Sequence, residues 1–369
     1  MNRFFQQILI GLILFLFPVL LPGTVTAEET WLATEQGYKV WNPVPRDRDS
    51  VTWSGGVDAE GYATGKGVLK WFDAGTLYQT GEVTLAKGKA SGLGSESYLD
   101  TGNRFEGNFV DGLRSGKGVY IYKNGDRYDG DWVDDKRTGK GIFTWNDGDR
   151  YEGDFVDGKR TGKGIYTWPS GNRYQGDLID GRQSGKGSFT WANGNRYEGD
   201  FVDGQRTGRG LFIWPNGDRY EGDFIEGRRT GKGAITWASG SHYEGDFVDG
   251  IRTGKGVYTW PNGNRYEGDF AADRMNGKGV YTWFNGDRYE GDWTDDTQNG
   301  KGIYTWANGD RYEGDYKSDA MNGKGVYTFK NGDRYEGEFV NNRFHGSGTL
   351  YYINGTIQKG QWENDQFIG

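Results

Sequence analysis

A unit of 23 residues repeats along most of this chain, and this repetition limits the possible folds more than any other feature of the sequence. The copy at residues 150–168 reads RYEGDFVDGKRTGKGIYTW. Its tyrosine recurs at every 23rd residue from Tyr128 to Tyr335, and Phe105 holds the same position one step earlier. A short fixed period is typical of arrays whose units pack against their neighbours. We therefore expect one elongated domain rather than several globular ones.

The spacing divides the chain into segments with different degrees of regularity. Atypical units at the ends of an array are expected to cap it. The lead-in segment carries Trp31 and Trp41, which we expect to cover the first strand. The segments are a signal peptide (1–27), the lead-in segment (28–50), degenerate N-terminal repeats (51–104), eleven regular repeats (105–357) and a degenerate C-terminal cap (358–369).

The first 27 residues have the pattern of a secretory signal peptide. A lone Arg3 precedes an apolar run from Ile8 to Leu21, and Val25, Thr26 and Ala27 suit a small-residue cleavage site. The run is shorter than the ~20 residues that span a bilayer comfortably. We expect an exported protein, periplasmic or extracellular, with an uncleaved membrane anchor as the alternative. The chain has no cysteine, so disulfide content neither supports nor opposes export.

The composition indicates a folded array and makes two classes of partner less favourable. Glycine is abundant (66 residues), but 15 Trp, 24 Tyr and 20 Phe supply the large side chains that disordered segments lack. The net charge is −8, and basic residues are interleaved with acidic ones in every repeat. Nucleic acids and anionic membranes favour clustered positive charge. We therefore expect no nucleic-acid binding, and phospholipid binding has little support.

Within each repeat, the side chains alternate with a period of two. Tyr151 and Phe155 share one face and Glu152 and Asp154 the other, which predicts a half-buried strand. A second alternating stretch ends at Trp168. Residues 157–161 are expected to form a polar turn, and the Pro-Ser-Gly or Pro-Asn-Gly that follows the tryptophan a tight hairpin turn. The predicted fold is all-β: an elongated, single-layer antiparallel meander of repeated β-hairpins.

The two faces of this sheet are expected to be stabilised differently. Gly153 lies between Tyr151 and Phe155, so a ring from a neighbouring strand is expected to lie across the bare backbone there. Aromatic pairs contribute about 0.5–1.5 kcal/mol beyond the area they bury. On the opposite face, Arg150 and Lys163 are expected to join the acidic residues in a solvated lattice of charges.

The pattern Y-E-G-x-F/W…G-x-x-x-G-K-G-x-Y-x-W/Y resembles the MORN repeat, the membrane occupation and recognition nexus motif. The resemblance covers residues 51–369, and departures such as Gln175 for Glu and Ile235 for Tyr affect single units. It implies a β-hairpin ribbon that acts as a scaffold or interaction module. In eukaryotic relatives the repeats accompany a phosphoinositide kinase or methyltransferase domain or hold a protein at a membrane junction, and lipid binding has been proposed. This sequence contains neither catalytic domain.

Three patterns could suggest chemistry, and each has a simpler explanation. Residues 158–164 look superficially like a phosphate-binding loop, but the spacing is wrong and no Ser or Thr follows Lys163. The recurring acidic groups lack the spacing of calcium-binding β-rolls. His242 and His345 are isolated in sequence. We predict no catalytic, cofactor or metal site and no enzyme activity, because near-identical repeats do not supply one unique pocket.

The aromatic face is the candidate binding surface. We expect most of its rings to form the ribbon's own packing, with some aromatic surface open to a partner because a single layer cannot cover both faces. The candidate ladder comprises Tyr128, Trp145, Tyr151, Phe155, Trp168, Tyr174, Trp191, Tyr197, Trp214, Tyr220, Trp237, Tyr243, Trp260 and Tyr266.

These features favour a non-catalytic, secreted scaffold that binds proteins, including further copies of itself. The alternative is a glycan or cell-envelope-binding module that uses the aromatic ladder. A peripheral lipid binder is a third hypothesis.

Overall fold

The computed structural model describes residues 30–369, so the predicted signal peptide lies outside the described residues. This part of the chain is built from strands and turns and has no helix. Consequently, it offers no helical segment with the length and apolarity to cross a membrane.

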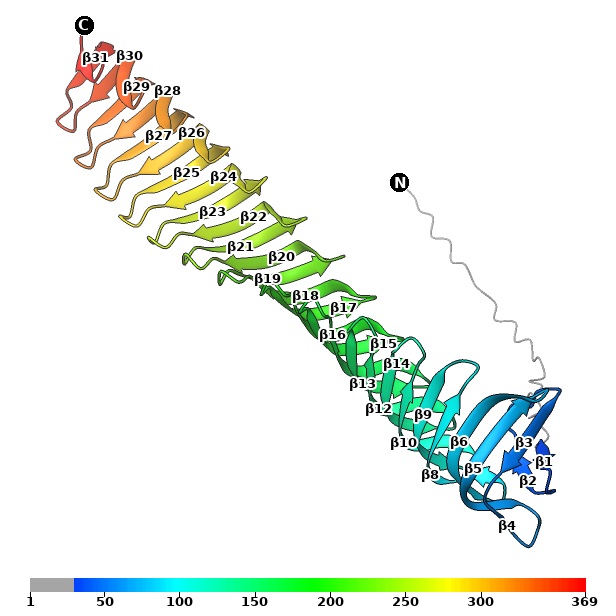
Figure 1. Ribbon diagram of the computed structural model, residues 1–369. Coiled ribbons are helices and arrows are strands. Elements are labelled where there is room, and N and C mark those ends of the chain that lie inside the picture. Colours follow the sequence, from blue (N-terminus) through cyan, green and yellow to red (C-terminus); the bar gives the residue numbers. More distant parts are fainter. Residues whose placement is uncertain (1–29) are drawn as a thin grey trace, which may run out of the picture.

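The strands follow one another in a single antiparallel file. After the N-terminal pairings β3–β5–β6–β8–β9, every strand from β9 to β31 pairs with the strand before and after it in sequence, and β32 pairs with β31. Figure 1 shows the result as a long twisted ribbon with the blue N-terminal strands and the red C-terminal strands at opposite extremes. The ribbon twists because each strand has an intrinsic right-handed twist about its own axis. The predicted single-layer, all-β meander is confirmed.

The first strands are irregular in length. They are β1 (Trp31–Ala33), β2 (Lys39–Trp41), β3 (Asp49–Trp53), β4 (Gly56–Val57), β5 (Ala63–Asp73), β6 (Thr76–Ala86), β7 (Lys89–Ala90) and β8 (Gly92–Tyr98).

The regular array follows, with a shorter and a longer strand in each hairpin. Its strands are β9 (Asn103–Val110), β10 (Leu113–Ile121), β11 (Arg127–Val133), β12 (Lys136–Thr144), β13 (Arg150–Val156), β14 (Lys159–Thr167), β15 (Arg173–Ile179), β16 (Arg182–Thr190), β17 (Arg196–Val202), β18 (Gln205–Ile213), β19 (Arg219–Ile225), β20 (Arg228–Thr236), β21 (His242–Val248), β22 (Ile251–Thr259), β23 (Arg265–Ala271), β24 (Arg274–Thr282), β25 (Arg288–Thr294), β26 (Thr297–Thr305), β27 (Arg311–Lys317), β28 (Ala320–Thr328), β29 (Arg334–Val340) and β30 (Arg343–Tyr351). The chain ends with β31 (Ile357–Glu363) and β32 (Gln366–Phe367).

Each hairpin of the array reverses in two residues. Between β13 and β14, Asp157 and Gly158 have φ angles of 48° and 81°. Two consecutive positive φ values give a turn whose twist matches the flanking strands. The predicted turn over residues 157–161 is therefore too long, because Lys159 already pairs with Val156 as part of β14.

The second strand contains a bulge that explains the Gly-x-x-x-Gly-Lys-Gly pattern. The pairing between β13 and β14 shifts between Gly153 and Phe155, and Gly162 takes a φ of 78° within the displaced segment. The Lys163 N–H donates to the Asp154 carboxylate at 2.9 Å. A bulge leaves backbone groups without ladder partners. The repeated aspartate satisfies one of them, so the motif is structural.

The turns that follow Trp168 and its equivalents, at the other end of the strands, confirm the predicted tight connection. They also link neighbouring repeats. The Trp168 N–H donates to Asn172 O at 3.0 Å, and Gly171 has a φ of 91°. The side-chain oxygen of Asn172 accepts the backbone N–H of Ala192, in the next repeat, at 2.9 Å. This turn is therefore held both by its own hairpin and by the hairpin that follows. Where the next repeat has Pro169, Pro215 or Pro261 at the position of Ala192, that N–H is missing.

The lead-in segment forms a small hairpin of β1 and β2 that packs on the start of the array. Trp31 lies edge-on to Tyr62 with ring centroids 5.0 Å apart. Trp41 lies against the Gly112 turn, where an added Cβ would come 2.2 Å from the indole ring. The tryptophans thus contact residues beyond the first strand of the sheet.

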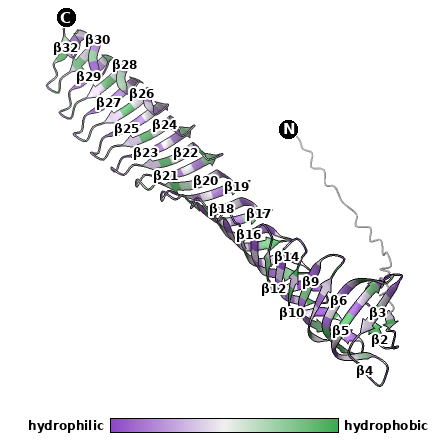
Figure 2. Ribbon diagram, viewed as in Figure 1, coloured by the Kyte–Doolittle hydropathy of each residue, from purple (hydrophilic) through white to green (hydrophobic). Residues whose placement is uncertain are grey.

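Hydrophobic and hydrophilic residues alternate along the full length of the ribbon. Figure 2 shows both colours in nearly every strand, with no apolar block at one end. The core is consequently a row of buried side chains that runs the length of the array, as expected when each repeat buries its apolar face only against its neighbours.

Candidate functional site

The innermost layer of the aromatic face is a row of buried rings, interrupted where Leu178 replaces the phenylalanine of its repeat. Tyr197 meets Phe201 of its own strand and Phe224 of the next repeat edge-on, with centroids 5.2 and 5.1 Å apart. Edge-to-face contacts suit the charge distribution of aromatic rings. We call this the inner aromatic row; its tyrosines, all 0% exposed, are Tyr128, Tyr151, Tyr174, Tyr197, Tyr220, Tyr243, Tyr266, Tyr289, Tyr312 and Tyr335.

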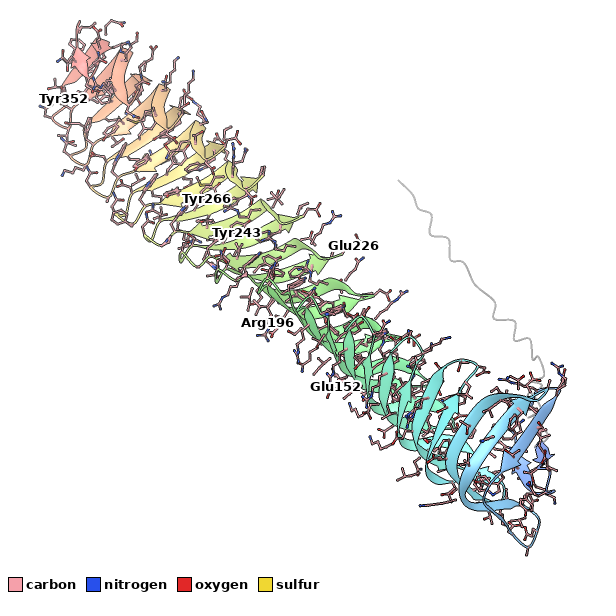
Figure 3. The ribbon with its side chains drawn as sticks, viewed as in Figure 1. Glu152, Arg196, Glu226, Tyr243, Tyr266 and Tyr352 are labelled. Carbon is pink, nitrogen blue, oxygen red and sulfur yellow. The ribbon has the colours of Figure 1, made fainter. Side chains whose placement is uncertain are left out.

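The tyrosine hydroxyls of this row are satisfied by backbone. Tyr151 donates to Asp154 O at 2.9 Å, and Tyr243 donates to Asp246 O at 3.2 Å. Burial raises the pKa of both phenols to about 12. In Figure 3, Tyr243 and Tyr266 lie within the ribbon, whereas Arg196 and Glu226 project from it. The seven tyrosines of the predicted ladder therefore have no surface to offer a partner.

Glycines provide the space that these rings occupy. A Cβ added at Gly164 would lie 2.4 Å from Cε2 of Tyr151, and one added at Gly153 would lie 2.5 Å from the Tyr151 hydroxyl. The ring over Gly153 thus comes from its own strand, not from a neighbouring strand as predicted, because Tyr151 leans along β13 and reaches across to β14.

A second row of rings lies beside the first and remains partly exposed. Trp168 contacts Tyr166 and Phe189, with centroids 4.3 and 5.4 Å apart. We call this the outer aromatic row. Its predicted ladder members, each partly buried, are Trp145, Trp168, Trp191, Trp214, Trp237 and Trp260. The predicted ladder is therefore two rows, of which the tryptophans are the accessible part.

Arginines lie over both rows in the first part of the array. The Arg160 guanidinium carbon lies 4.9 Å from the Trp145 ring centroid and 5.7 Å from that of Tyr151. Such contacts favour the cation over the ring face. We call this the arginine row: Arg114, Arg137, Arg160, Arg206, Arg229 and Arg252. The sequence interpretation missed it, although aligning the repeats at their 23-residue period reveals the column.

The arginine row ends abruptly in the later repeats. The equivalent positions there hold Met275, Gln298, Met321 and Phe344. Among residues 30–369, only two members of the row form ion pairs, Arg114 with Asp135 at 2.7 Å and Arg252 with Asp273 at 3.0 Å.

The opposite face carries a groove of about 2070 Å³ that extends over several repeats, from Arg209 to Ser347. Across the strands of the groove, aliphatic and acidic side chains alternate. For example, Glu290 pairs with Val280 on the preceding strand and with Ile303 on the following strand. The groove is therefore a repeating surface rather than a single pocket.

Neighbouring side chains neutralise the charges along this groove. Lys278 contacts Asp292 at 2.5 Å, and Arg288 contacts Glu290 at 2.6 Å. Burial raises the pKa of Asp292, but hydrogen bonds from Lys278 and from the Lys301 N–H outweigh it and lower the pKa overall. The predicted lattice of charges is confirmed.

Aliphatic side chains stand exposed on the same face near the two-residue turns. All are more than half exposed, and they occur in seven consecutive repeats. We call them the aliphatic row: Val110, Val133, Val156, Ile179, Val202, Ile225 and Val248. The next three repeats have Ala271, Thr294 and Lys317 instead.

The isolated histidines do not form a metal site with their surroundings. His242 lies at the groove, where its Nδ1 is 3.0 Å from the Thr236 hydroxyl. In the part of the chain from residue 30 onward, no group of three or more His, Cys, Asp or Glu side chains is placed to hold a metal ion.

Solved structures resemble this chain only weakly. The SAS-4 (dCPAP) TCP domain of Drosophila melanogaster, in complex with a proline-rich motif of Ana2 (dSTIL), is 16% identical and has a TM-score of 0.26, over 48% of this chain and 85% of that chain. The TCP10 domain of Danio rerio CPAP is 12% identical with a TM-score of 0.30, over 60% and 99%. Virginiamycin B lyase from Staphylococcus aureus is 10% identical with a TM-score of 0.13, over 74% and 84%. No curated protein matches this chain.

Family models give a stronger result. The MORN repeat model matches eleven consecutive segments without a gap, from residues 105–127 to residues 335–357. The matched segments follow the hairpins of the regular array, and each begins at Phe105 or at a tyrosine of the inner aromatic row. The chain belongs to the MORN repeat family.

Proposed function

We propose that this protein is an exported, non-catalytic scaffold that binds protein partners along the groove face of its array. A repeat-based interaction module is what MORN repeats suggest. The observation that carries the proposal is the groove, which presents the same alternation of aliphatic and charged groups over several successive repeats.

The chemistry of this face suits a protein partner. Protein interfaces combine apolar contacts with polar and charged groups at the rim. Here Val280 and Ile303 alternate with glutamates in the groove, and the aliphatic row continues the apolar contacts toward the N-terminal repeats. An extended segment of a partner could engage several repeats, each contributing a small part of the free energy of binding.

A non-catalytic role is supported by the repetition of the polar groups. Lys255, Lys278 and Lys301 each pair with an aspartate of the next repeat at 2.5 or 2.6 Å. Catalysis requires groups with distinct environments and matched pKa values. Within the groove, Glu267, Glu290 and Glu313 each pair with the arginine two residues before them.

Export is proposed from the sequence of residues 1–27. The test is N-terminal sequencing of the protein recovered from periplasmic and extracellular fractions. A first residue of Glu28 is expected. A protein that retains Met1 and sediments with membranes would support the uncleaved anchor.

The experiment for the scaffold function compares two triple variants of the mature chain. The first reverses the groove lysines, Lys255→Glu, Lys278→Glu and Lys301→Glu. The control reverses charges outside the groove and away from the aliphatic row, Arg48→Glu, Lys87→Glu and Arg274→Glu, which also form exposed ion pairs. Exposed pairs contribute less than about 1 kcal/mol each, so both variants are expected to fold.

The wild-type chain is used to capture proteins from the exported fraction, and each captured protein is then purified and titrated against all three chains. A direct partner whose affinity falls in the groove variant but not in the control is expected. Equal affinity for both variants would contradict the groove as the binding surface. Retention only by protease-treated cell-wall polysaccharide would contradict a protein partner.

Self-association is part of the proposal and has its own test. Light scattering of the mature chain over a range of concentrations is expected to show a mass above that of the monomer. A monomer at every concentration would remove the homo-oligomer from the proposal.

The partly exposed tryptophans of the outer aromatic row support a glycan-binding module as the second candidate function. Co-sedimentation with purified cell wall, and with neutral and anionic vesicles, separates this candidate from a protein scaffold and from a lipid binder.

A further inference from the structure

A small cavity of about 280 Å³ lies on the aromatic face, opposite the groove. Rings form its apolar lining, and two members of the arginine row stand on either side. The lining residues that matter here are Arg137, Phe143, Trp145, Phe155 and Arg160. Ligand sites commonly combine aromatic walls with a few placed polar groups.

The two guanidinium groups keep donors available. Arg137 donates to Gly158 O at 2.9 Å, and Arg160 makes a side-chain hydrogen bond with the Tyr166 hydroxyl. Neither arginine belongs to an ion pair among residues 30–369. A guanidinium has five N–H donors, so one such contact leaves most of them unused. At the rim, Lys159 is neutralised by Asp180 at 3.0 Å. The cavity therefore has a net positive lining.

The packing of the array does not require this charge. Met275 and Met321 fill the same position in later repeats, over equivalent tyrosines, and Met321 is buried. A charge that is removed from water without an ionic partner destabilises the fold. At the equivalent positions three repeats further along, burial lowers the pKa of Arg206 and Arg229. A methionine packs in this position but cannot donate to the next turn, as Arg137, Arg206 and Arg229 do to the carbonyl oxygens of Gly158, Gly227 and Gly250 at 2.9, 2.7 and 3.1 Å. The other donors of each guanidinium remain available to a ligand.

The same arrangement recurs three repeats further along. Arg206 and Arg229 flank Phe212 and Trp214, with the Arg206 guanidinium carbon 5.3 Å from the Phe212 centroid and that of Arg229 5.4 Å from the Trp214 centroid. Gln183 separates the two arginine pairs. Equivalent positions are six strand spacings apart, roughly 28 Å at the usual spacing.

We propose that the aromatic face of residues 128–250 binds a polysaccharide that carries carboxylates. Each arginine pair holds a carboxylate, and the sugar rings lie against Trp145 and Trp214. The planar guanidinium fork matches a carboxylate in two parallel hydrogen bonds.

Rigid sugar rings suit this surface better than an acidic peptide does. The tryptophans offer flat faces for stacking, whereas long acidic side chains would lose rotamer freedom on binding. Two sites on one polymer also strengthen each other, because binding at the first raises the local concentration at the second. The inference concerns the face opposite the groove, so its failure would leave the proposed protein scaffold untouched.

The test titrates the mature chain, residues 28–369, with polygalacturonate in the presence of EDTA. The comparison ligands are methyl-esterified polygalacturonate, polyglutamate and vesicles that contain anionic phospholipid. We expect binding to polygalacturonate and its loss on esterification. We expect the variants R137M/R160M and R206M/R229M each to weaken binding by about tenfold.

The control is K163M/R209M, which removes the same charge from the opposite face and is expected to bind as the wild type does. Thermal unfolding verifies that the variants are folded. If a methionine pair does not fold, R137Q/R160Q replaces it, because Gln183 and Gln298 occupy this position naturally. Undiminished binding by both arginine variants would overturn the site. Tighter binding to polyglutamate or vesicles would overturn the ligand class.

Discussion

Tyr151 lies across Gly164 so closely that a Cβ at the glycine would come 2.4 Å from Cε2 of the ring. The two residues belong to adjacent strands of one hairpin, and the glycine faces Gly153 in the strand register. The contact fills the space of the missing side chain with a ring that is 0% exposed. A ribbon without a second layer thus obtains a buried core from its own backbone.

The substitution Gly164→Ala tests this contact. We expect the free energy of unfolding to fall by about 1–3 kcal/mol, the usual cost of an overpacked site. Urea denaturation measures it through the transition midpoint. The control is Gly56→Ala, where the nearest atom to an added Cβ is 3.6 Å away. Indistinguishable midpoints for the two variants would contradict the role of Gly164 as a seat for the ring.

The hydroxyl of Tyr151 is tested separately by Tyr151→Phe. The Asp154 carbonyl would lose a donor at 2.9 Å, which is expected to cost about 0.5–1.5 kcal/mol. The ring itself is retained, and Phe105 shows that phenylalanine fits this position. Tyr352→Phe, at a partly exposed site, is the control and is expected to change stability by less than about 0.5 kcal/mol. A Tyr151→Phe chain as stable as wild type would show that water replaces the hydroxyl without loss.

Stability is expected to fall in acid because turn aspartates are held in their charged form. Burial raises the pKa of Asp287, but hydrogen bonds from the Ala307 N–H at 2.8 Å and from Asn285 and Tyr304 at 3.1 Å outweigh it, so the pKa is lowered overall. In the unfolded chain, the pKa of an aspartate is about 3.9. Below that pH the unfolded chain binds protons that the folded chain does not, so stability decreases as the pH falls toward the folded pKa.

Urea unfolding between pH 7 and 3 measures this loss. The variant Asp287→Asn is expected to lose less stability between these pH values, because an asparagine does not titrate. One repeat earlier, Asn264 holds the same position and accepts the Phe284 N–H at 2.9 Å. Parallel pH profiles for wild type and variant would contradict a contribution from this carboxylate.

Stability is also expected to fall in strong alkali, because the folded state raises the pKa of buried tyrosines. Burial raises the pKa of Tyr151, Tyr197 and Tyr220 to about 12, whereas the unfolded phenols titrate near 10. As the pH rises from about 10 to 12, the unfolded chain releases protons that the folded chain keeps, which favours unfolding. Phenolate absorbance and far-ultraviolet circular dichroism are expected to change together. Complete ionisation of tyrosine with unchanged circular dichroism would contradict the buried row.

The repeat period and the two-residue alternation were enough to predict the hairpins, the meander and the face on which each side chain lies. Tyr151 and Phe155 point inward and Glu152 outward, as the pattern indicates. This inference succeeds because strand alternation is a local property of the backbone. The same regularity marks out no unique catalytic residue. Because all the rings share one face of the predicted strands, the sequence also placed them in a single ladder.

The tertiary structure separated that ladder into a buried inner row and a partly exposed outer row, and it revealed the arginine row. The bulge in β14 shifts the pairing so that Arg160 stands opposite Phe155, which simple alternation does not show.

The sequence by itself thus determined the repeating unit, its strands and the two faces of the ribbon, because each follows from spacing within 23 residues. Which rings remain accessible, which arginines have no ionic partner and where a groove opens were decided only by contacts between repeats. Those contacts depend on the register shift at each bulge and on the packing of each ring against the next hairpin.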